Sequence, residues 1–389
     1  MRALLAVLLV QQFLSLTSDQ LNRPADAAGA VGPHHIVGVS NLGVVVQSRG
    51  GEVVKMTTLN EFWSGGAVTG VHYFDSRVMY DAAADRWVLG TLFVEDFPKS
   101  SMLIATSDSG DPAGSWTRMQ IEVPTQNVFI DFPRMALTTD RVIVTVNSSG
   151  GSEILTFPAH TQTTTSMHDL QPVTSDGPDA LFLHNDKSGT VDLYRLDGST
   201  LKPVGHFTTE PWQSPANTAI APQLDSASRM DVGDTTFQSA VARNGFVWAV
   251  HTIVTNNRSA IRWWKIAADG SHAETGTIGD AASFYAFPSI AVNRQNAALI
   301  SYCVFSAQLH PSMGYSYRDG NGVTSTEISS SGTSVPNQQR WGDFTTTVTD
   351  PLNDLDFWSA GLASSGAAWS AWWSEIRSLP PARIRVVRH

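Results

Sequence analysis

The sequence predicts an all-β fold, a seven-bladed β-propeller with four-stranded antiparallel blades; six blades are the alternative count. A three-part pattern recurs about seven times at a spacing of roughly 45 to 60 residues, which is typical of propeller blades. Only 15% of the 389 residues are charged, and Ser, Thr, Gly, Val and Trp, which favour strands and turns over helices, take their place. No segment shows a long helical period, so the chain is expected to consist almost entirely of strands.

Each copy of the pattern has an aromatic residue beside Asp, Pro or Ser, a short apolar strand, a polar turn and a second apolar strand. Asp, Asn and Gly occupy the turns, where they tolerate the left-handed backbone of tight hairpins. A β-sandwich or a β-helix is the alternative, but the spacing is too long for β-helix coils and closure of a ring removes open sheet edges. The clearest copies span residues 74–89, 131–146, 237–250, 287–300 and 340–359, and weaker copies span 31–46 and 178–194.

The two ends of the chain differ from the repeats. Arg2 followed by the apolar run Leu4 to Leu16 is typical of a signal peptide and is too short to span a bilayer. We therefore expect a secreted protein, extracellular or periplasmic, monomeric and without a membrane span. The expected organisation is a signal peptide at 1–18, a flexible leader at 19–27, the propeller domain at 28–381 and a basic tail at 382–389.

Charge and motifs exclude several classes of function. The formal net charge is -10, so nucleic acid is not an expected partner, because phosphate binding needs a basic surface. The zinc motif HExxH, the phosphate loop, the dinucleotide-binding glycine pattern and the Gly-x-Ser-x-Gly elbow are all absent from the sequence. The single cysteine, Cys303, lies in an apolar strand pattern and is interpreted as a small buried hydrophobe.

The residues that lead into the innermost strands are the candidate site. In a propeller these strands surround the axial channel, so the residues before them converge at one mouth. Forked guanidinium groups suit a carboxylate or another small anion, and neighbouring carboxyl groups can act as general acid and base. An alternative is that Asp and Arg at the same entrance pair with each other and tie the blades together. The predicted catalytic residues are Asp75, Asp131 and Asp343, and the predicted anion-binding residues are Arg77, Arg134 and Arg340.

Two aromatic residues near blade entrances, Trp341 and Tyr285, are candidates for stacking on a sugar ring. Most of the other Trp and Tyr side chains are expected to pack between blades, and the same packing is the alternative for these two.

Two turns carry further motifs. Residues 109–116 read Ser-Gly-Asp-Pro-Ala-Gly-Ser-Trp, which is close to an Asp-box with one extra residue. Asp111 is expected to hold the turn amides and Trp116 to fill the blade core, on the side away from the active centre. The hairpin with Asp350, Asn353, Asp354 and Asp356 offers oxygen ligands for Ca²⁺, with a solvated turn as the alternative; no other cofactor is expected.

Several of these sequence segments resemble a known group of proteins. The segments 74–81, 131–134, 288–293 and 340–344, together with the Asp-box-like turn, resemble exported bacterial β-propeller proteins related in fold to sialidases. The resemblance covers roughly residues 28 to 377 and implies a propeller fold and export. The Phe-Arg-Ile-Pro motif of sialidases is absent.

Two functions follow as hypotheses. The first is a glycoside hydrolase or polysaccharide lyase that acts on extracellular anionic glycans through the Arg and Asp residues of the funnel. The second is a non-catalytic propeller that binds a ligand or serves as a scaffold outside the cell. Open arginines around a concave pocket favour the first hypothesis, and closed Asp–Arg pairs without a cavity favour the second.

Overall fold

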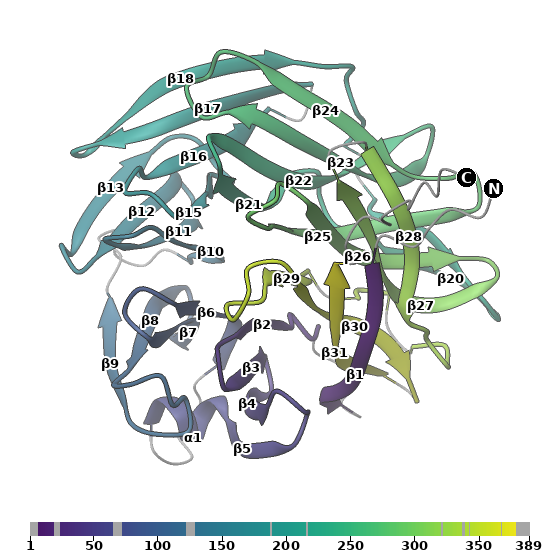
Figure 1. Ribbon diagram of the computed structural model, residues 1–389, viewed down its shortest axis with the longest axis horizontal. Helices are drawn as coiled ribbons and strands as arrows, with labels where there is room; N and C mark the ends of the chain where they lie inside the picture. Colours follow the sequence, from purple (N-terminus) through teal and green to yellow (C-terminus); the bar gives the residue numbers. More distant parts are fainter. Residues whose placement is uncertain are drawn as a thin grey trace, which may run out of the picture.

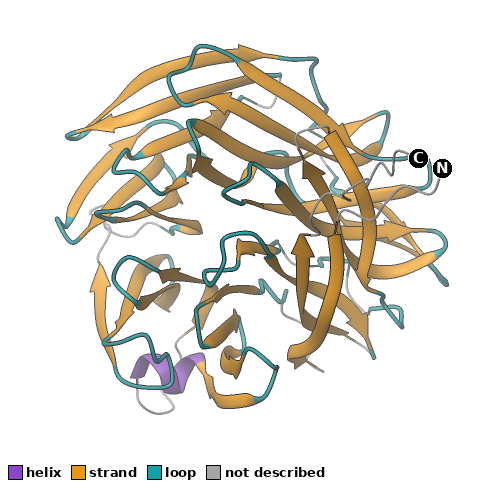
Figure 2. Ribbon diagram, viewed as in Figure 1, coloured by secondary structure: helices purple, strands orange, loops and turns teal. Residues whose placement is uncertain are grey.

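The seven predicted blades form a ring around an axial channel (Figure 1). The computed structural model describes residues 7–18, 24–64, 72–121, 129–186, 189–214, 217–319, 322–336, 339–341, 343–366 and 368–378. Strands dominate these residues, and the single helix among them, α1 (Leu59–Ser64), is short (Figure 2). The predicted all-β, seven-bladed architecture is therefore confirmed. The predicted basic tail, 382–389, lies outside the described residues.

Each blade is a sheet of four antiparallel strands. Blade 1 contains β2 (Ala28–Val31), β3 (His35–Ser40), β4 (Gly43–Ser48) and β5 (Val53–Thr58). Blade 2 contains β6 (His72–Asp81), β7 (Arg86–Asp96), β8 (Lys99–Ser107) and β9 (Trp116–Ile121). Blade 3 contains β10 (Asp131–Leu137), β11 (Val142–Ser148), β12 (Gly151–Phe157) and β13 (Thr161–Thr165). Blade 4 contains β14 (Gln171–Pro172), β16 (Leu181–Asn185), β17 (Thr190–Asp197) and β18 (Thr200–Thr208).

The remaining blades follow the same order. Blade 5 contains β21 (Phe237–Arg243), β22 (Phe246–Thr255), β23 (Arg258–Ala267) and β24 (Ala273–Ile278), and β15 (Thr174–Ser175) joins its inner edge in parallel. Blade 6 contains β25 (Ser283–Val292), β26 (Ala298–Ser306), β27 (Leu309–Asp319) and β28 (Gly322–Ser330). Blade 7 contains β29 (Thr346–Thr349), β30 (Phe357–Ser365), β31 (Ala368–Ser378) and β1 (Val7–Ser18). Between blades 4 and 5 the chain forms a separate hairpin, β19 (Ala219–Gln223) and β20 (Ser226–Asp231).

The five clearest sequence copies correspond to the two innermost strands of blades 2, 3, 5, 6 and 7. The two weaker copies are displaced by one strand. Residues 36–39 and 181–183 belong to β3 and β16, which are the second strands of their blades. The innermost strands of these blades, β2 and β14, have only four and two residues. Such short strands give too few residues for an alternating pattern to show.

A bulge marks the start of several innermost strands. The register shifts between Phe74 and Arg77 in blade 2, and the equivalent places in blades 3 and 6 are also shifted. A residue with a left-handed backbone sits at each bulge: Asp75 at φ 54°, Phe132 at φ 57° and Phe287 at φ 55°. A bulge bends the strand and redirects side chains, so it separates the entrance residue from the regular strand beyond it.

The strand β1 closes the ring. It pairs antiparallel with β31, so that the two ends of the described chain share blade 7 (Figure 1). Its glutamines also bond to both neighbouring blades: Gln11 Nε2 donates to the Arg49 carbonyl of blade 1 (3.0 Å), and Gln12 Nε2 donates to Ser330 Oγ of blade 6 (2.7 Å). This strand is the segment predicted to be a signal peptide, and export stays a prediction. Residues 25–27 of the predicted flexible leader are buried.

Apolar cores lie between adjacent blades. Seven tryptophan rings rank among the largest fully buried side chains of the described residues, including Trp87, Trp248 and Trp373. One core cluster joins Cys303 of blade 6 with Trp369 of blade 7, Ala27 before blade 1 and Met230 of the β19–β20 hairpin. Among the described residues no helix is long and apolar enough to cross a membrane.

Candidate functional site

A network of polar groups joins blades 7, 1 and 2 at the end of the channel where the innermost strands begin, here called the mouth. The Asn41 amide, in the turn after β3, donates to Asp26 Oδ2 (2.6 Å) and accepts from the Asp75 backbone N–H (2.8 Å). The Asp343 backbone N–H donates to Asp26 Oδ1 at 3.3 Å. Arg340 Nη2 donates to Asp343 Oδ2 at 2.6 Å. Three blades therefore bring the carboxyl groups of Asp26, Asp75 and Asp343 into one buried cluster.

The carboxyl groups at the mouth affect one another's protonation. Burial raises the pKa of Asp75 well above its usual range, and the nearby carboxylates of Asp26 and Asp131 raise it further. Burial also raises the pKa of Asp343 to about 6, with Asp26 adding to the shift and Arg340 opposing it. Asp75 and Asp343 therefore hold their protons at a higher pH than isolated aspartates do, which is a property of general acids.

The three predicted catalytic aspartates lie at the mouth, but their exposure differs. Asp75 and Asp343 are buried, whereas Asp131 is exposed and its Oδ1 accepts from the next backbone N–H, that of Phe132, at 2.8 Å. Asp131 is close enough to Asp75 to influence its titration. The structure thus brings Asp131 and Asp343 close to Asp75, with one residue exposed and two buried.

The three predicted arginines separate into two groups. The Arg340 side chain is 61% exposed and forms an ion pair with Asp343. Arg77 and Arg134 instead line the axial channel below the mouth. Arg134 Nη2 lies 3.3 Å from Asp169 Oδ1 and 3.4 Å from Thr236 Oγ1, while Arg77 Nε donates to the Pro133 carbonyl at 3.0 Å.

Two phenylalanine rings hold Arg77 and Arg134. The Arg77 guanidinium lies over Phe344 and the Arg134 guanidinium lies over Phe132, 4.5 Å from the ring centroid. The two rings contact each other edge to face, with centroids 5.5 Å apart. This stack uses the flat faces of both guanidinium groups and leaves their N–H edges to donate in the plane.

The channel contains a cavity of about 590 Å³, within the range of small-molecule sites. Its wall comes from the innermost strands of all seven blades. Arg77 and Arg134 line the mouth end, and Arg243 and Asp354 line the opposite end, here called the base. The described mouth carboxyl groups Asp26, Asp75, Asp131 and Asp343 do not line this cavity.

Trp341 and Tyr285 do not reach the channel. Trp341 is fully buried and packs with Phe305 and Cys303 in the core cluster that joins blades 6 and 7. Tyr285 is also buried, in the core between blades 5 and 6. Burial raises the pKa of its hydroxyl to about 12. Neither ring has a face open to a sugar in this structure. Both pack between blades, which was the alternative considered for them.

The Asp-box-like turn lies at the base end, between β8 and β9, the two outer strands of blade 2. Asp111 Oδ1 accepts from the Ala113 backbone N–H (2.9 Å), and Trp116 is buried in the core between blades 1 and 2. Trp116 Nε1 donates to the Pro112 carbonyl at 3.0 Å. The turn thus has the geometry predicted for it and stands away from the mouth.

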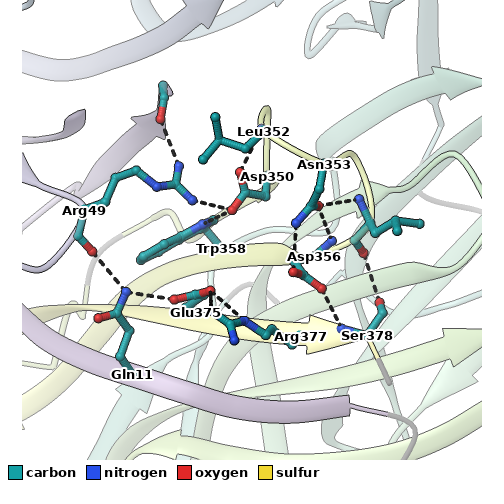
Figure 3. Close-up of polar contacts among 12 residues, drawn as sticks. Gln11, Arg49, Asp350, Leu352, Asn353, Asp356, Trp358, Glu375, Arg377 and Ser378 are labelled. Carbon is teal, nitrogen blue, oxygen red and sulfur yellow. Dashed lines mark hydrogen bonds and ion pairs between the residues drawn. The ribbon is translucent and has the colours of Figure 1, made fainter. Parts of the chain in front are cut away.

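The acidic hairpin at 350–356 forms part of a polar network at the base (Figure 3). Asp350 pairs with Arg49 of blade 1 and accepts from Trp358 Nε1 at 3.0 Å. Asp356 accepts from Asn353 Nδ2 (2.9 Å) and from a backbone N–H of β31 (3.0 Å). Among the described residues no group of three His, Cys, Asp or Glu side chains could hold a metal ion, and the Ca²⁺ hypothesis stays untested.

A second cavity, of about 470 Å³, lies beside this hairpin. Gln11 of β1 borders it and donates to Glu375 Oε2 at 2.8 Å (Figure 3). Glu375 also accepts from Arg377 at 3.1 Å. The guanidinium and carboxylate groups around this cavity satisfy one another, so they act as a junction between β1, blade 7 and blade 1.

Sequence reasoning missed four residues of the mouth. Asp26 lies two residues before β2, as expected of an entrance residue, but the first copy of the pattern was placed one strand too late. Phe132 and Phe344 follow Asp131 and Asp343 directly, and the repeated Asp-Phe pair is the signal that could have identified them. Asn41 sits in a turn between second and third strands and carries no such signal.

Comparison with known proteins finds only distant similarity. No protein-family profile matches the chain, and no curated protein matches its sequence. The chain is similar to the N-terminal domain of Nup159, with 10% identity, a TM-score of 0.49 and coverage of 96% of this chain and 95% of that chain. It is similar to the WD40 domain of SCAP from fission yeast (8%, TM-score 0.41, 93% and 86%). It is also similar to an exo-β-1,3-galactanase from Clostridium thermocellum (10%, TM-score 0.40, 83% and 65%). Similarities this distant do not indicate an activity.

Proposed function

We propose that this β-propeller is an extracellular glycan-directed enzyme, a glycoside hydrolase or polysaccharide lyase, that binds its substrate at the mouth. The observation that carries the proposal is the carboxyl cluster of Asp26, Asp75 and Asp343, brought from three blades to one end of the channel beside the exposed Asp131. Glycosidic bonds need a protonated carboxyl group to assist the leaving oxygen and a second carboxylate to act as base or nucleophile.

The environments of these carboxyl groups suit the two roles, a protonated acid and a second carboxylate. Asp75 and Asp343, with raised pKa values, supply the acid, and the exposed Asp131 supplies the second carboxyl group. Arg340 is the exposed cation at the mouth, so it is the group that would contact an acidic sugar, at the cost of its pair with Asp343.

The proposal is tested by incubating the purified protein with a panel of acidic and neutral polysaccharides and sialosides. New reducing ends indicate hydrolysis, and ultraviolet absorbance of an unsaturated product indicates a lyase. Asp75→Asn and Asp343→Asn are expected to reduce turnover by about 100-fold or more, the usual contribution of a general acid or base. Asp140→Asn is the matched control, because Asp140 is exposed in a turn at the base. Unchanged activity in both mouth variants would remove the assigned roles.

The second candidate is a binding or scaffold propeller without catalysis. The ion pairs Arg340–Asp343 and Arg134–Asp169, and the burial of Asp75, favour it, because paired groups are less available to a substrate. Glycan binding that is measurable by calorimetry, without turnover on any substrate of the panel, would establish this function in place of the enzymatic one.

A further inference from the structure

The structure assigns a second ligand to the axial channel: an amphipathic monoanion whose carboxylate or phosphate head binds Arg77 and Arg134 and whose apolar chain extends toward the base. This site is independent of the glycan chemistry proposed for the mouth, because it uses the cavity wall and not the carboxyl cluster. Arg77 and Arg134 thereby keep the anion-binding role predicted from the sequence, but they bind the anion inside the ring.

The first argument is an unsatisfied cation. Arg134 is 4% exposed, and it lines the cavity. Its Nη2 contacts Asp169 and Thr236, but the buried Nε and Nη1 atoms have no hydrogen-bond partner. Leaving buried N–H donors unpaired is costly, and more so on a charged group. A turn of the Arg134 side chain toward the channel would bring these donors to a bound anion.

The second argument is the position of Arg77. Among the described residues it forms no ion pair, and its only hydrogen bond is the one from Nε to the Pro133 carbonyl. Burial lowers the pKa of Arg77 to about 10; the Asp75 and Asp26 carboxyl groups oppose this shift, and the nearby Arg134 cation contributes to it. Two like charges that face one cavity repel each other, and a shared anion removes that repulsion.

The mouth carboxylates do not occupy the place of this anion. They influence Arg77 through space, yet none of them lines the cavity. Asp26 is held by Asn41, and Asp343 is held by Arg340. Both arginines therefore line the cavity, while the carboxyl groups lie on the mouth side.

The third argument is the wall between the two ends. It is formed mainly by aliphatic side chains and by Thr and Ser, with Val78, Met135, Val241 and Ile290 among the aliphatic ones. The hydroxyl groups on β25 and at β29 bond to one another: Ser289 Oγ lies 2.8 Å from Thr345 Oγ1 and 2.7 Å from Thr347 Oγ1. A mainly aliphatic wall on which these hydroxyl groups are already paired suits an apolar chain better than a sugar, which needs many hydrogen bonds.

The base end of the cavity is closed to a second anionic group. Arg243 pairs with Asp354 and lies 3.6 Å from Asp176, so its charge is compensated. Arg49 pairs with Asp350 in the same way. Both cations at the base are therefore ion-paired, whereas Arg77 at the mouth end forms no ion pair among the described residues. This difference fixes the direction of the ligand: head at Arg77 and Arg134, chain toward the base.

The test is isothermal titration calorimetry of the full chain with decanoate, decyl phosphate, decan-1-ol and acetate. We expect decanoate or decyl phosphate to bind at least tenfold more tightly than decan-1-ol, which lacks the charge, and than acetate, which lacks the chain. The better of the two anions identifies the head group. Absence of saturable binding by either anion, or equal binding of decan-1-ol, would overturn the assignment.

Variants separate the site from a general effect on folding. Arg134→Gln and Arg77→Gln are each expected to weaken binding of the anion by tenfold or more. Val241→Phe, which narrows the cavity while both arginines remain, is expected to weaken it as well. Arg118→Gln is the matched control, since Arg118 is exposed on β9 and lies outside the cavity, and it should bind as the parent does. If Arg134→Gln fails to fold, the affinities of Arg77→Gln and Val241→Phe for the anion decide the test. Parent-like affinity in both variants would contradict the proposal.

Discussion

Asp343 combines burial, a neighbouring carboxyl group and one arginine in a single position. Its side chain is 12% exposed, and its Oδ2 accepts from Arg340. Burial and Asp26 together outweigh the arginine, so the folded protein holds a proton on Asp343 up to a pH of about 6. An unfolded aspartate loses its proton near pH 4.

This difference predicts the pH dependence of stability. Because the folded pKa is raised, the contribution of Asp343 is fully present below about pH 4 and is lost as pH rises through 6. The loss is at most about 3 kcal/mol, since one pKa unit is worth about 1.4 kcal/mol. Asp343→Asn cannot ionise, and it should flatten this part of the profile in urea unfolding measured from pH 4 to pH 7.

The control for that experiment is Asp140→Asn. Its hydrogen bonds to Arg141 and Thr138 lower the pKa of Asp140 to about 2, so the group is ionised in both the folded and unfolded states above pH 5. Its replacement should leave the slope between pH 5 and pH 7 unchanged. A parent-like slope in Asp343→Asn would show that other groups of the mouth determine the pH dependence.

The sequence placed residues at the mouth where the pattern was long and missed them where it was short. Asp75, Asp131 and Asp343 were placed there because each precedes a strand copy that is visible in the sequence, and their catalytic roles stay a prediction. Asp26 was missed because β2 has four residues and offers no alternation. Trp341 and Tyr285 were placed near the right ends of their strands, but sequence alternation does not tell whether a bulged segment directs a ring to the channel or to the core.

At the scale of elements, β1 has two faces with different surroundings. Leu16 is 5% exposed and belongs to the core cluster shared with Cys303 and Trp369, whereas Val10 is 38% exposed on the same strand. The Leu14 carbonyl also accepts from Gln47 Nε2 of blade 1 at 2.9 Å. The strand thus contributes both packing and hydrogen bonds to the closure of the ring.

These faces give a matched pair of variants. Leu16→Asp buries a charge and should lower the free energy of unfolding by about 2 to 4 kcal/mol. Val10→Asp leaves the charge in solvent and should change it by less than about 0.5 kcal/mol. Urea unfolding of both proteins measures the difference, and the mass of the purified protein tells whether the strand is retained. Two indistinguishable unfolding curves would show that β1 does not close the ring.

The Asp-box-like turn shows what an element contributes without reaching the mouth. Asp111 Oδ1 accepts from the Ala113 backbone N–H, and Trp116 fills the core between blades 1 and 2. Asp111→Ala should cost about 1 kcal/mol, as loss of one turn hydrogen bond does. Trp116→Ala should cost about 3 to 5 kcal/mol through the cavity it leaves. Thermal melting measures both, and glycan turnover per folded molecule should be unchanged.

At the scale of the whole molecule, the cores between blades couple parts of the chain that are far apart in sequence. The cluster that contains Cys303 of β26 also contains Leu16 of β1, Leu362 of β30 and Val232 after β20. Opening blade 6 therefore disturbs blade 7 and the ring closure as well. A ring whose units share cores in this way is expected to unfold cooperatively, in contrast with an open array of repeats.

Cys303 makes this coupling measurable, because it is the single cysteine of the chain. It is fully buried, and burial raises the pKa of its thiol to about 12, so a thiol reagent reaches it only after the surrounding structure opens. In the native protein we expect labelling to report the same free energy as global urea unfolding. Leu16→Asp, which acts on the other side of the shared cluster, should accelerate labelling at least tenfold, since 1.4 kcal/mol corresponds to a factor of ten. Rapid labelling of a parent protein that is otherwise stable would mean that blade 6 opens alone. In that case the ring is a set of separately stable blades, and a lost strand in blade 7 would leave the mouth and its carboxyl cluster intact.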